Sequence, residues 1–201
     1  MISNDNQLID SLKKEEMISL LEKKVYEMFQ ILIFDVDHDI QIIDSPKRIA
    51  KMYVNELFRG CYEEEPKITV FENTKEYNEM VFLGPIEIKS MCSHHWQPFL
   101  GSCYIAYIPD KKIVGISKFS RITKFFMRRP QIQEELTKQI ANYIQSKLQP
   151  KGVGVYIEAT HMCMIMRGVE ESQKAKMKTS CLQGNFTDAA VRAEFFTMIK
   201  G

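Results

Sequence analysis

The sequence predicts an α+β fold, because helix-like and strand-like segments occur in separate groups instead of alternating along the chain. Three observations support this. The first 60 residues are helical in pattern, β-branched and aromatic residues concentrate from residue 81 to residue 116, and two helices separate these strands from a second group. Of the 201 residues, 45% are hydrophobic and 26% charged, which is typical of a globular protein. We therefore expect a helical region at 1–60 and a main domain at 61–201.

The N-terminal region is predicted to contain helices only. Apolar residues recur at roughly helical spacing through 6–34, as one long helix or two. A further helix is predicted to begin at Ser45, a favourable N-cap, with Pro46 at its first position, and to end at Gly60. The acidic segment that follows is expected to be irregular apart from a short strand at 68–71.

The remaining elements form the predicted sheet and its helices. Strands are predicted from β-branched and aromatic runs that end at turn residues such as Pro109-Asp110-Lys111-Lys112. Helices are predicted where apolar residues recur on one face, and Gln149-Pro150-Lys151-Gly152 ends the longer one. The strands are expected at 81–91, 96–108, 113–116, 153–160, 162–167 and 177–182, and the helices at 119–127, 130–148 and 188–199.

Charge is unevenly distributed, although the formal net charge is only +1. The first 60 residues carry eight Lys/Arg and eleven Asp/Glu, whereas residues 92–133 carry seven Lys/Arg and a single acid, Asp110. A local basic region suits a small anion better than a nucleic acid, so no nucleic-acid partner is expected. No segment reaches the ~18 apolar residues of a membrane span. Five cysteines without a secretion signal indicate thiols in a reducing compartment, and we expect a cytoplasmic protein with no membrane partner.

Two short motifs contain the candidate chemistry. Cys92-Ser93-His94-His95 and His161-Met162-Cys163 hold three of the four histidines and two of the five cysteines. Thiolate and imidazole are standard zinc ligands, and a catalytic zinc takes three protein ligands plus a water, which Cys92, His95 and Cys163 can supply. His94 and His161 would then lie beside the metal, where an imidazole can transfer protons near neutral pH.

The same cysteines and histidines admit simpler interpretations. Taken alone, the first motif suits a structural zinc site as well as a catalytic one. The isolated residues Cys61, Cys103 and Cys181 are more typical of small buried hydrophobic side chains than of ligands.

Longer motifs resemble a known family. The stretches SMCSHHWQPFLGSCYIAYIP, VGISKFSRITKFFMRRPQIQEELTKQIA and GVGVYIEATHMCMIMRGV, with SPKRIAKMYVNELFRG before and KTSCLQGNF after them, closely resemble GTP cyclohydrolase I, from about residue 45 to residue 197. The resemblance implies the tunnelling fold, in which an antiparallel sheet carries helices on one face and sheets of several subunits close into a barrel. It also implies a homodecamer of two pentamers with active sites at subunit boundaries, which would pair the edge strands of each chain.

The resemblance also implies a role for individual residues. Zinc would be the cofactor, bound by Cys92, His95 and Cys163, and His94 and His161 would donate and accept protons. Glu134, with Gln133 beside it, would recognise the guanine edge, because a carboxylate can accept two hydrogens from that base. The ribose and triphosphate would be held by Arg48, Ser117, Lys118, Arg121 and Arg167. Without the resemblance, Glu134, Lys118 and Arg121 would be interpreted as ordinary surface charges. Position 93 departs from the family, which usually has Glu where this chain has Ser93.

The implied activity is the zinc-dependent hydrolysis and rearrangement of GTP to 7,8-dihydroneopterin triphosphate and formate. Folate, tetrahydrobiopterin and 7-deazapurine routes all begin with this reaction. Two alternatives are a 7-deazaguanine nitrile reductase of the same fold, which uses a cysteine nucleophile and NADPH, and a non-catalytic scaffold braced by zinc. The intact set of zinc ligands argues against the first, and the two additional histidines argue against the second.

Overall fold

A computed structural model describes residues 10–200, which fall into two compact units. The first unit ends at Glu64 and the second begins at Glu65. The part of the predicted first helix that precedes residue 10 lies outside the described residues. Within the described range, no helix is both long and apolar enough to cross a membrane.

The first unit is built from two helices. Helix α1 (Ser11–Ile31) begins after Asp10, whose carboxylate accepts a hydrogen bond of 2.7 Å from the backbone N–H of Lys13, as an N-cap should. Helix α2 (Ser45–Met52) has the predicted proline in its first turn and continues into a π-helical turn, Tyr53–Leu57, and a 3₁₀ turn, Arg59–Cys61. The core of this unit is small and consists of the buried residues Ile18, Ala50 and Val54 with their half-buried neighbours.

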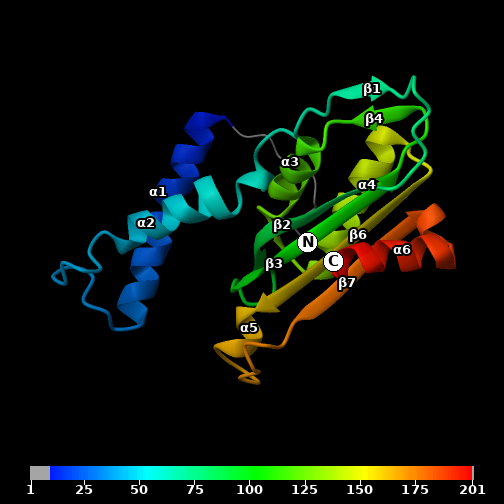
Figure 1. Ribbon diagram of the computed structural model, residues 1–201. Helices are drawn as coiled ribbons and strands as arrows, with labels where there is room; N and C mark the ends of the chain where they lie inside the picture. Colours follow the sequence, from blue (N-terminus) through cyan, green and yellow to red (C-terminus); the bar gives the residue numbers. More distant parts are fainter. Residues whose placement is uncertain (1–9, 201) are drawn as a thin grey trace. The chain divides into compact units, whose positions relative to one another are not determined.

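The second unit contains a five-stranded sheet in the order β5-β2-β3-β6-β7. Figure 1 labels β2, β3, β6 and β7 of this sheet. Its strands are β2 (Val81–Cys92), β3 (Pro98–Ile108), β5 (Pro130–Gln131), β6 (Gly152–His161) and β7 (Met177–Gly184). The four long strands pair antiparallel, whereas the short β5 pairs parallel with β2, so the sheet is mixed. A separate two-stranded sheet joins β1 (Val70–Glu72) to β4 (Lys112–Val114).

The larger core lies between the sheet and two helices, α3 (Ser117–Phe126) and α4 (Gln133–Leu148). Strand residues alternate between the two faces of a sheet, so every second residue of β3 and β6 contributes to this core. Ile105 and Val155 are neighbours in register and are both completely buried, and Ile140 of α4 belongs to the same cluster.

Helix α6 (Ala189–Lys200) packs on the opposite face of the sheet, which corrects the prediction that helices cover one face only. Its residue Phe195 is completely buried with Ala106 and Tyr156, which belong to the other set of alternating strand positions. Gly154 allows this packing, because a β-carbon there would lie 2.6 Å from a ring carbon of Phe186. The second face is therefore apolar enough to need a helix of its own.

The predicted strand at 162–167 is wrong, because the chain forms a one-turn helix there, α5 (Met162–Ile165). The last residue of β6, His161, is paired with Phe99, while the pairing of β6 with β7 already ends at Ala159 and Met177. Beyond this point the backbone has no neighbouring strand, and its groups bond locally, as in the 2.9 Å bond from Met166 N–H to the Met162 oxygen.

Candidate active site

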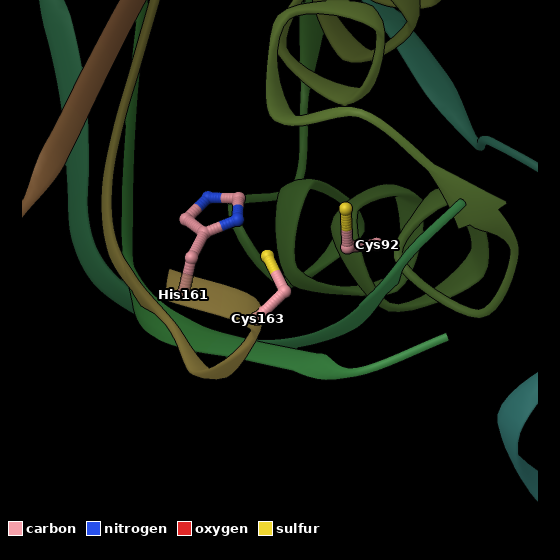
Figure 2. A group of neighbouring side chains, drawn as sticks. All are labelled: Cys92, His161 and Cys163. Carbon is pink, nitrogen blue, oxygen red and sulfur yellow. The ribbon is translucent and has the colours of Figure 1, made fainter. Parts of the chain in front are cut away.

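Three potential metal ligands converge at one end of the sheet. Cys92 is the last residue of β2, His161 is the last residue of β6, and Cys163 lies in α5 immediately after it. Their ligand atoms all lie within 4.8 Å of one another, and Figure 2 shows the imidazole beside the two sulfur atoms. Cys92 is 69 or more positions from the other two residues in sequence, but only β3, which pairs with both β2 and β6, separates their strands in space.

His161 is held in one orientation by two contacts. Its Nε2 atom lies 2.9 Å from Oε1 of Gln133, and its ring stacks on Phe99 with centroids 4.7 Å apart and planes 10° from parallel. Burial lowers the pKa of His161, and the negative charge of Glu134 partly opposes this shift. The site therefore favours a neutral imidazole that is able to accept a proton.

The two thiols fit a site for a soft cation. Burial raises the pKa of Cys163, the neighbouring Cys92 raises it further, and the positive charge of Arg167 acts in the opposite direction. Two thiols this close are costly to ionise together unless a cation compensates their charge. The combination of two sulfurs and imidazole nitrogen is the donor set that zinc prefers, so the residues present fit this metal.

The predicted ligand His95 lies outside this group of three. It belongs to the exposed turn after Cys92, which is closed by a bond of 2.9 Å from Trp96 N–H to the Cys92 oxygen and by one of 2.9 Å from Cys92 N–H to the Gln97 oxygen. His94 and His95 are both exposed, with ring centroids 6.3 Å apart. The structure thus brings together two of the three predicted ligands, Cys92 and Cys163, and one predicted proton-transfer residue, His161.

The predicted substrate-binding residues occupy different environments. Gln133 is completely buried, whereas its neighbour Glu134 is exposed in the first turn of α4. Arg48 lies in the first unit, where it forms an exposed ion pair of 3.1 Å with Asp44. The others are Ser117, exposed at the start of α3, Lys118 and Arg121 in the same helix, and Arg167 just after α5.

A cavity of about 330 Å³ opens beside His161. It is lined by His161, Met164, Ile165, Glu171, Ala175, Lys176 and Met177. The acidic and basic side chains among these residues place polar groups in an otherwise apolar wall, as expected of a small-molecule site.

Three residues around His161 were missed by the sequence motifs. Phe99 stacks on the imidazole, and Thr137 and Thr179 form hydrogen bonds with the residue that holds it, Gln133. Phe99 lies in an ordinary strand pattern, and the two threonines are 42 residues apart, so only the fold reveals their proximity.

Comparison with known proteins identifies the family. The family model described as GTP cyclohydrolase I matches residues 21–200, almost the whole chain. The chain belongs to the GTP cyclohydrolase I family. The motifs that carry Cys92, His161 and Cys163 lie within the matched residues, and the chain is accordingly an enzyme of the GTP cyclohydrolase I type.

Individual relatives support the same assignment. GTP cyclohydrolase 1 of Pseudoalteromonas translucida is 48% identical over 163 residues, which cover 80% of this chain and 87% of the relative. GTP cyclohydrolase 1 of Chlorobaculum tepidum is 43% identical over 190 residues, which cover 93% of this chain and 83% of the relative.

Two solved structures resemble part of the GTP cyclohydrolase I chain more weakly. An archaeosine synthase QueF-Like in its apo form gives a TM-score of 0.40 at 18% identity, covering 52% of this chain and 93% of that one. A putative dihydroneopterin aldolase from Vibrio cholerae gives a TM-score of 0.39 at 10% identity, covering 53% and 98%.

Proposed function

We propose that this enzyme converts GTP and water to 7,8-dihydroneopterin triphosphate and formate, with zinc as its cofactor. The observation that carries the proposal is the convergence of two thiols and one oriented imidazole at the same end of the sheet, in a chain of this family. A purely structural zinc site would not need an imidazole that is fixed by a dedicated hydrogen bond and a stacked ring.

Cys92 and Cys163 are the proposed thiolate ligands, and His95 is the proposed third ligand. The two cysteines lie together in the structure, and His95 is three residues beyond Cys92 on an exposed turn. When bound, zinc supplies Lewis-acid chemistry that makes water nucleophilic near neutral pH. The thiol pair would hold the cation at the end of β2, and the neighbouring His161 lines the cavity.

The remaining residues bind substrate and move protons. His161 is oriented to exchange a proton with the guanine ring, and His94 is proposed to assist the opening of the ribose. Glu134 is proposed to accept hydrogens from the guanine edge, and its charge already influences His161 across the site. Ribose and triphosphate are assigned to Ser117, Lys118, Arg121, Arg167 and Arg48.

The decisive test is incubation of the purified protein with GTP, followed by detection of formate and of the oxidised, fluorescent pterin. We expect both products in equal amounts from the zinc-loaded enzyme and neither from a Cys163→Ala variant. Formation of neither product by the zinc-loaded wild type would contradict the proposal.

An oligomer is proposed to complete the architecture. Among the described residues, β7 has no strand beyond it, and β5 covers only two residues of the outer edge of β2. Such edges are normally paired or protected, and a decamer of two pentamers would pair them. Light scattering should therefore give a mass far above the 23.5 kDa of one chain. A fully active monomer would contradict this arrangement.

The product is proposed to enter folate, tetrahydrobiopterin or 7-deazapurine synthesis in the cytoplasm. All five cysteines of the chain are free thiols in the structure, which suits a reducing compartment.

A further inference from the structure

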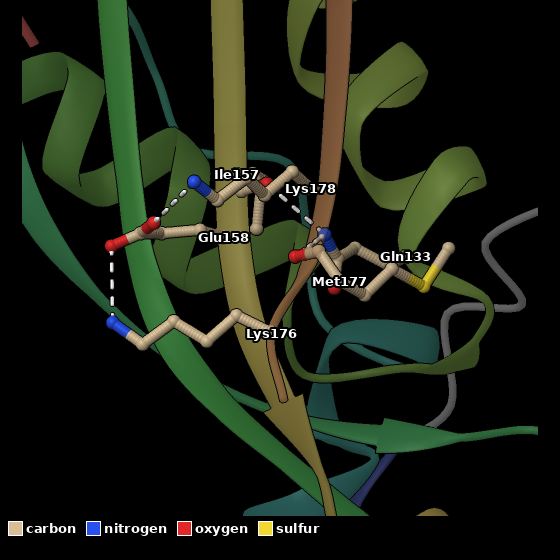
Figure 3. A network of polar contacts seen from close by, with 6 residues as sticks. All are labelled: Gln133, Ile157, Glu158, Lys176, Met177 and Lys178. Carbon is tan, nitrogen blue, oxygen red and sulfur yellow. Dashed lines mark hydrogen bonds and ion pairs between the residues drawn. The ribbon is translucent and has the colours of Figure 1, made fainter. Parts of the chain in front are cut away.

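A set of hydrogen bonds links the start of α4 to β6 and β7. Gln133 is completely buried, and its side-chain nitrogen Nε2 lies 3.1 Å from the Ile157 oxygen, 3.1 Å from the Met177 oxygen and 3.0 Å from Oγ1 of Thr179. Figure 3 shows Gln133 together with these two strands. Backbone oxygens only accept hydrogen bonds, so the atom that faces Ile157 and Met177 must be the amide nitrogen. The surroundings of the Gln133 amide therefore determine which way it points.

Thr137 and Thr179 complete this set with one consistent direction. Oγ1 of Thr137 donates to the backbone oxygen of Gln133 at 2.8 Å and lies 2.7 Å from Oγ1 of Thr179. A hydroxyl has a single hydrogen, and that of Thr137 is already used. Thr179 therefore donates to Thr137, and its Oγ1 is one of the three acceptors among which the two hydrogens of the Gln133 amide are shared. These hydrogen bonds form a closed ring that links the Gln133 side chain, through Thr179 and Thr137, to the backbone oxygen of Gln133 at the start of α4.

The other polar atom of Gln133 faces His161. Its Oε1 lies 2.9 Å from Nε2 of His161. An amide oxygen has no hydrogen to give, so Nε2 of His161 must carry the shared hydrogen, and the neutral ring keeps its lone pair on Nδ1. The opposite tautomer would place two lone pairs against each other in a buried position, which is unfavourable.

We propose that Gln133 is a positioning residue that holds His161 as the Nε2–H tautomer and leaves Nδ1 as its proton-accepting atom. The inference rests on the proposed function, because it concerns the proton transfer assigned to His161. It also replaces the direct contact with guanine that the sequence suggested for Gln133, since this side chain is fully buried and both of its polar atoms are engaged.

Nitrogen-15 NMR of histidine-labelled protein tests the tautomer directly. The chain has only four histidines, and the signal of His161 is identified by its loss in His161→Asn. In protein free of zinc and GTP at about pH 8, where a buried imidazole is neutral, we expect wild-type His161 to be entirely the Nε2–H tautomer. Observation of the Nδ1–H tautomer in the wild type would overturn the proposal without any substitution of Gln133.

Substitution of Gln133 then tests the cause. Gln133→Met keeps the length of the side chain and removes both polar atoms, and we expect a substantial Nδ1–H population in this variant. Gln131→Met is the matched control, because Gln131 is also buried but its amide nitrogen is directed at the Phe126 oxygen. We expect this control to keep the wild-type tautomer. A pure Nε2–H tautomer in Gln133→Met, or an equal change in both variants, would overturn the role of Gln133.

Kinetics separate positioning from base recognition. Loss of a group that orients a catalytic imidazole typically lowers activity about 10- to 100-fold, so kcat of Gln133→Met should fall by this factor. KM for GTP should stay within about threefold, because no substrate contact is lost. A raised KM with unchanged kcat would instead assign Gln133 to the base and overturn the proposal. Absence of pterin formation by the wild type, with the expected tautomer present, would refute the proposed function alone.

Discussion

Replacement of Phe99 by leucine should lower both the free energy of unfolding and the turnover number, and a control on the opposite face of the sheet separates the two effects. Phe99 is completely buried, and its ring stacks on His161 at 4.7 Å. The smaller side chain loses buried carbon surface and leaves a cavity, which together cost about 1–2 kcal/mol of the free energy of unfolding. Loss of the aromatic pair adds about 0.5–1.5 kcal/mol. We therefore expect a total destabilisation of about 1.5–3.5 kcal/mol.

The matched control is Phe195→Leu on the opposite face of the sheet. Phe195 is also completely buried and forms an edge-to-face pair with Phe186, with ring centroids 5.5 Å apart. Its replacement should destabilise the protein at least as much, because the same volume is lost together with ring pairs to Phe82, Phe186 and Phe196. The aromatic rings that pair with Phe195 do not include the imidazole of His161. A difference in turnover between the two variants therefore reports on the position of His161.

Urea unfolding and zinc-loaded turnover should be measured for both variants well below their unfolding temperatures. We expect the unfolding midpoint to shift at least as far in Phe195→Leu as in Phe99→Leu, but kcat to fall about tenfold or more in Phe99→Leu only, because a mobile imidazole is a poorer proton acceptor. Equal kcat values in the two variants would refute the argument that the stacked ring orients His161.

Three further predictions concern the metal, the base and the sheet. His95→Ala should lose most of the bound zinc, whereas His161→Ala should keep it and lose ~100- to 10,000-fold in turnover; metal analysis that showed the reverse would make His161 the third ligand. Glu134→Gln should weaken GTP binding by about 1.5–3 kcal/mol and leave affinity for inorganic triphosphate unchanged in titration calorimetry; equal weakening of both would indicate a structural role. Gly101→Ala should lower the free energy of unfolding by about 1–3 kcal/mol, because a β-carbon there would lie 2.6 Å from an α-carbon of β6. Gly115→Ala should have little effect, because a β-carbon there would have no atom within 4 Å. Similar urea midpoints for the two variants would contradict this.

Local signals in the sequence predicted most of the secondary structure. Helix α2 begins within one residue of the prediction, although its N-cap is Asp44 and not Ser45, and α4 ends before Gln149, which adopts a left-handed conformation with φ of 50°. These features depend on residues close in sequence, so a pattern can detect them. Helix α5 could not be predicted in this way, because Met162–Ile165 ceases to be a strand only where the neighbouring strands end.

The motifs selected three residues that the structure places together, but they did not predict the contacts around them. Cys92, His161 and Cys163 were selected from two short motifs, and the structure places them together. Nothing in those motifs indicates that Phe99 stacks on the imidazole, because the contact follows from the register of β3 with β6. Spacing within a motif limits ligand geometry, whereas register between distant strands determines the surroundings of each ligand.

Gln133 and Glu134 show why adjacent residues in a motif should not be given the same task. Successive residues of a helix point about 100° apart, so two neighbours at a helix start face different directions. In this chain Gln133 faces the sheet and is completely buried, and Glu134 is exposed. The buried amide can act on substrate only through His161, to which it is bonded at 2.9 Å, whereas the exposed carboxylate is free to meet a base. Gln133 is therefore expected to orient the proton acceptor, and Glu134 to recognise the substrate. For this reason Gln133→Met should lower kcat, whereas Glu134→Gln should weaken GTP binding.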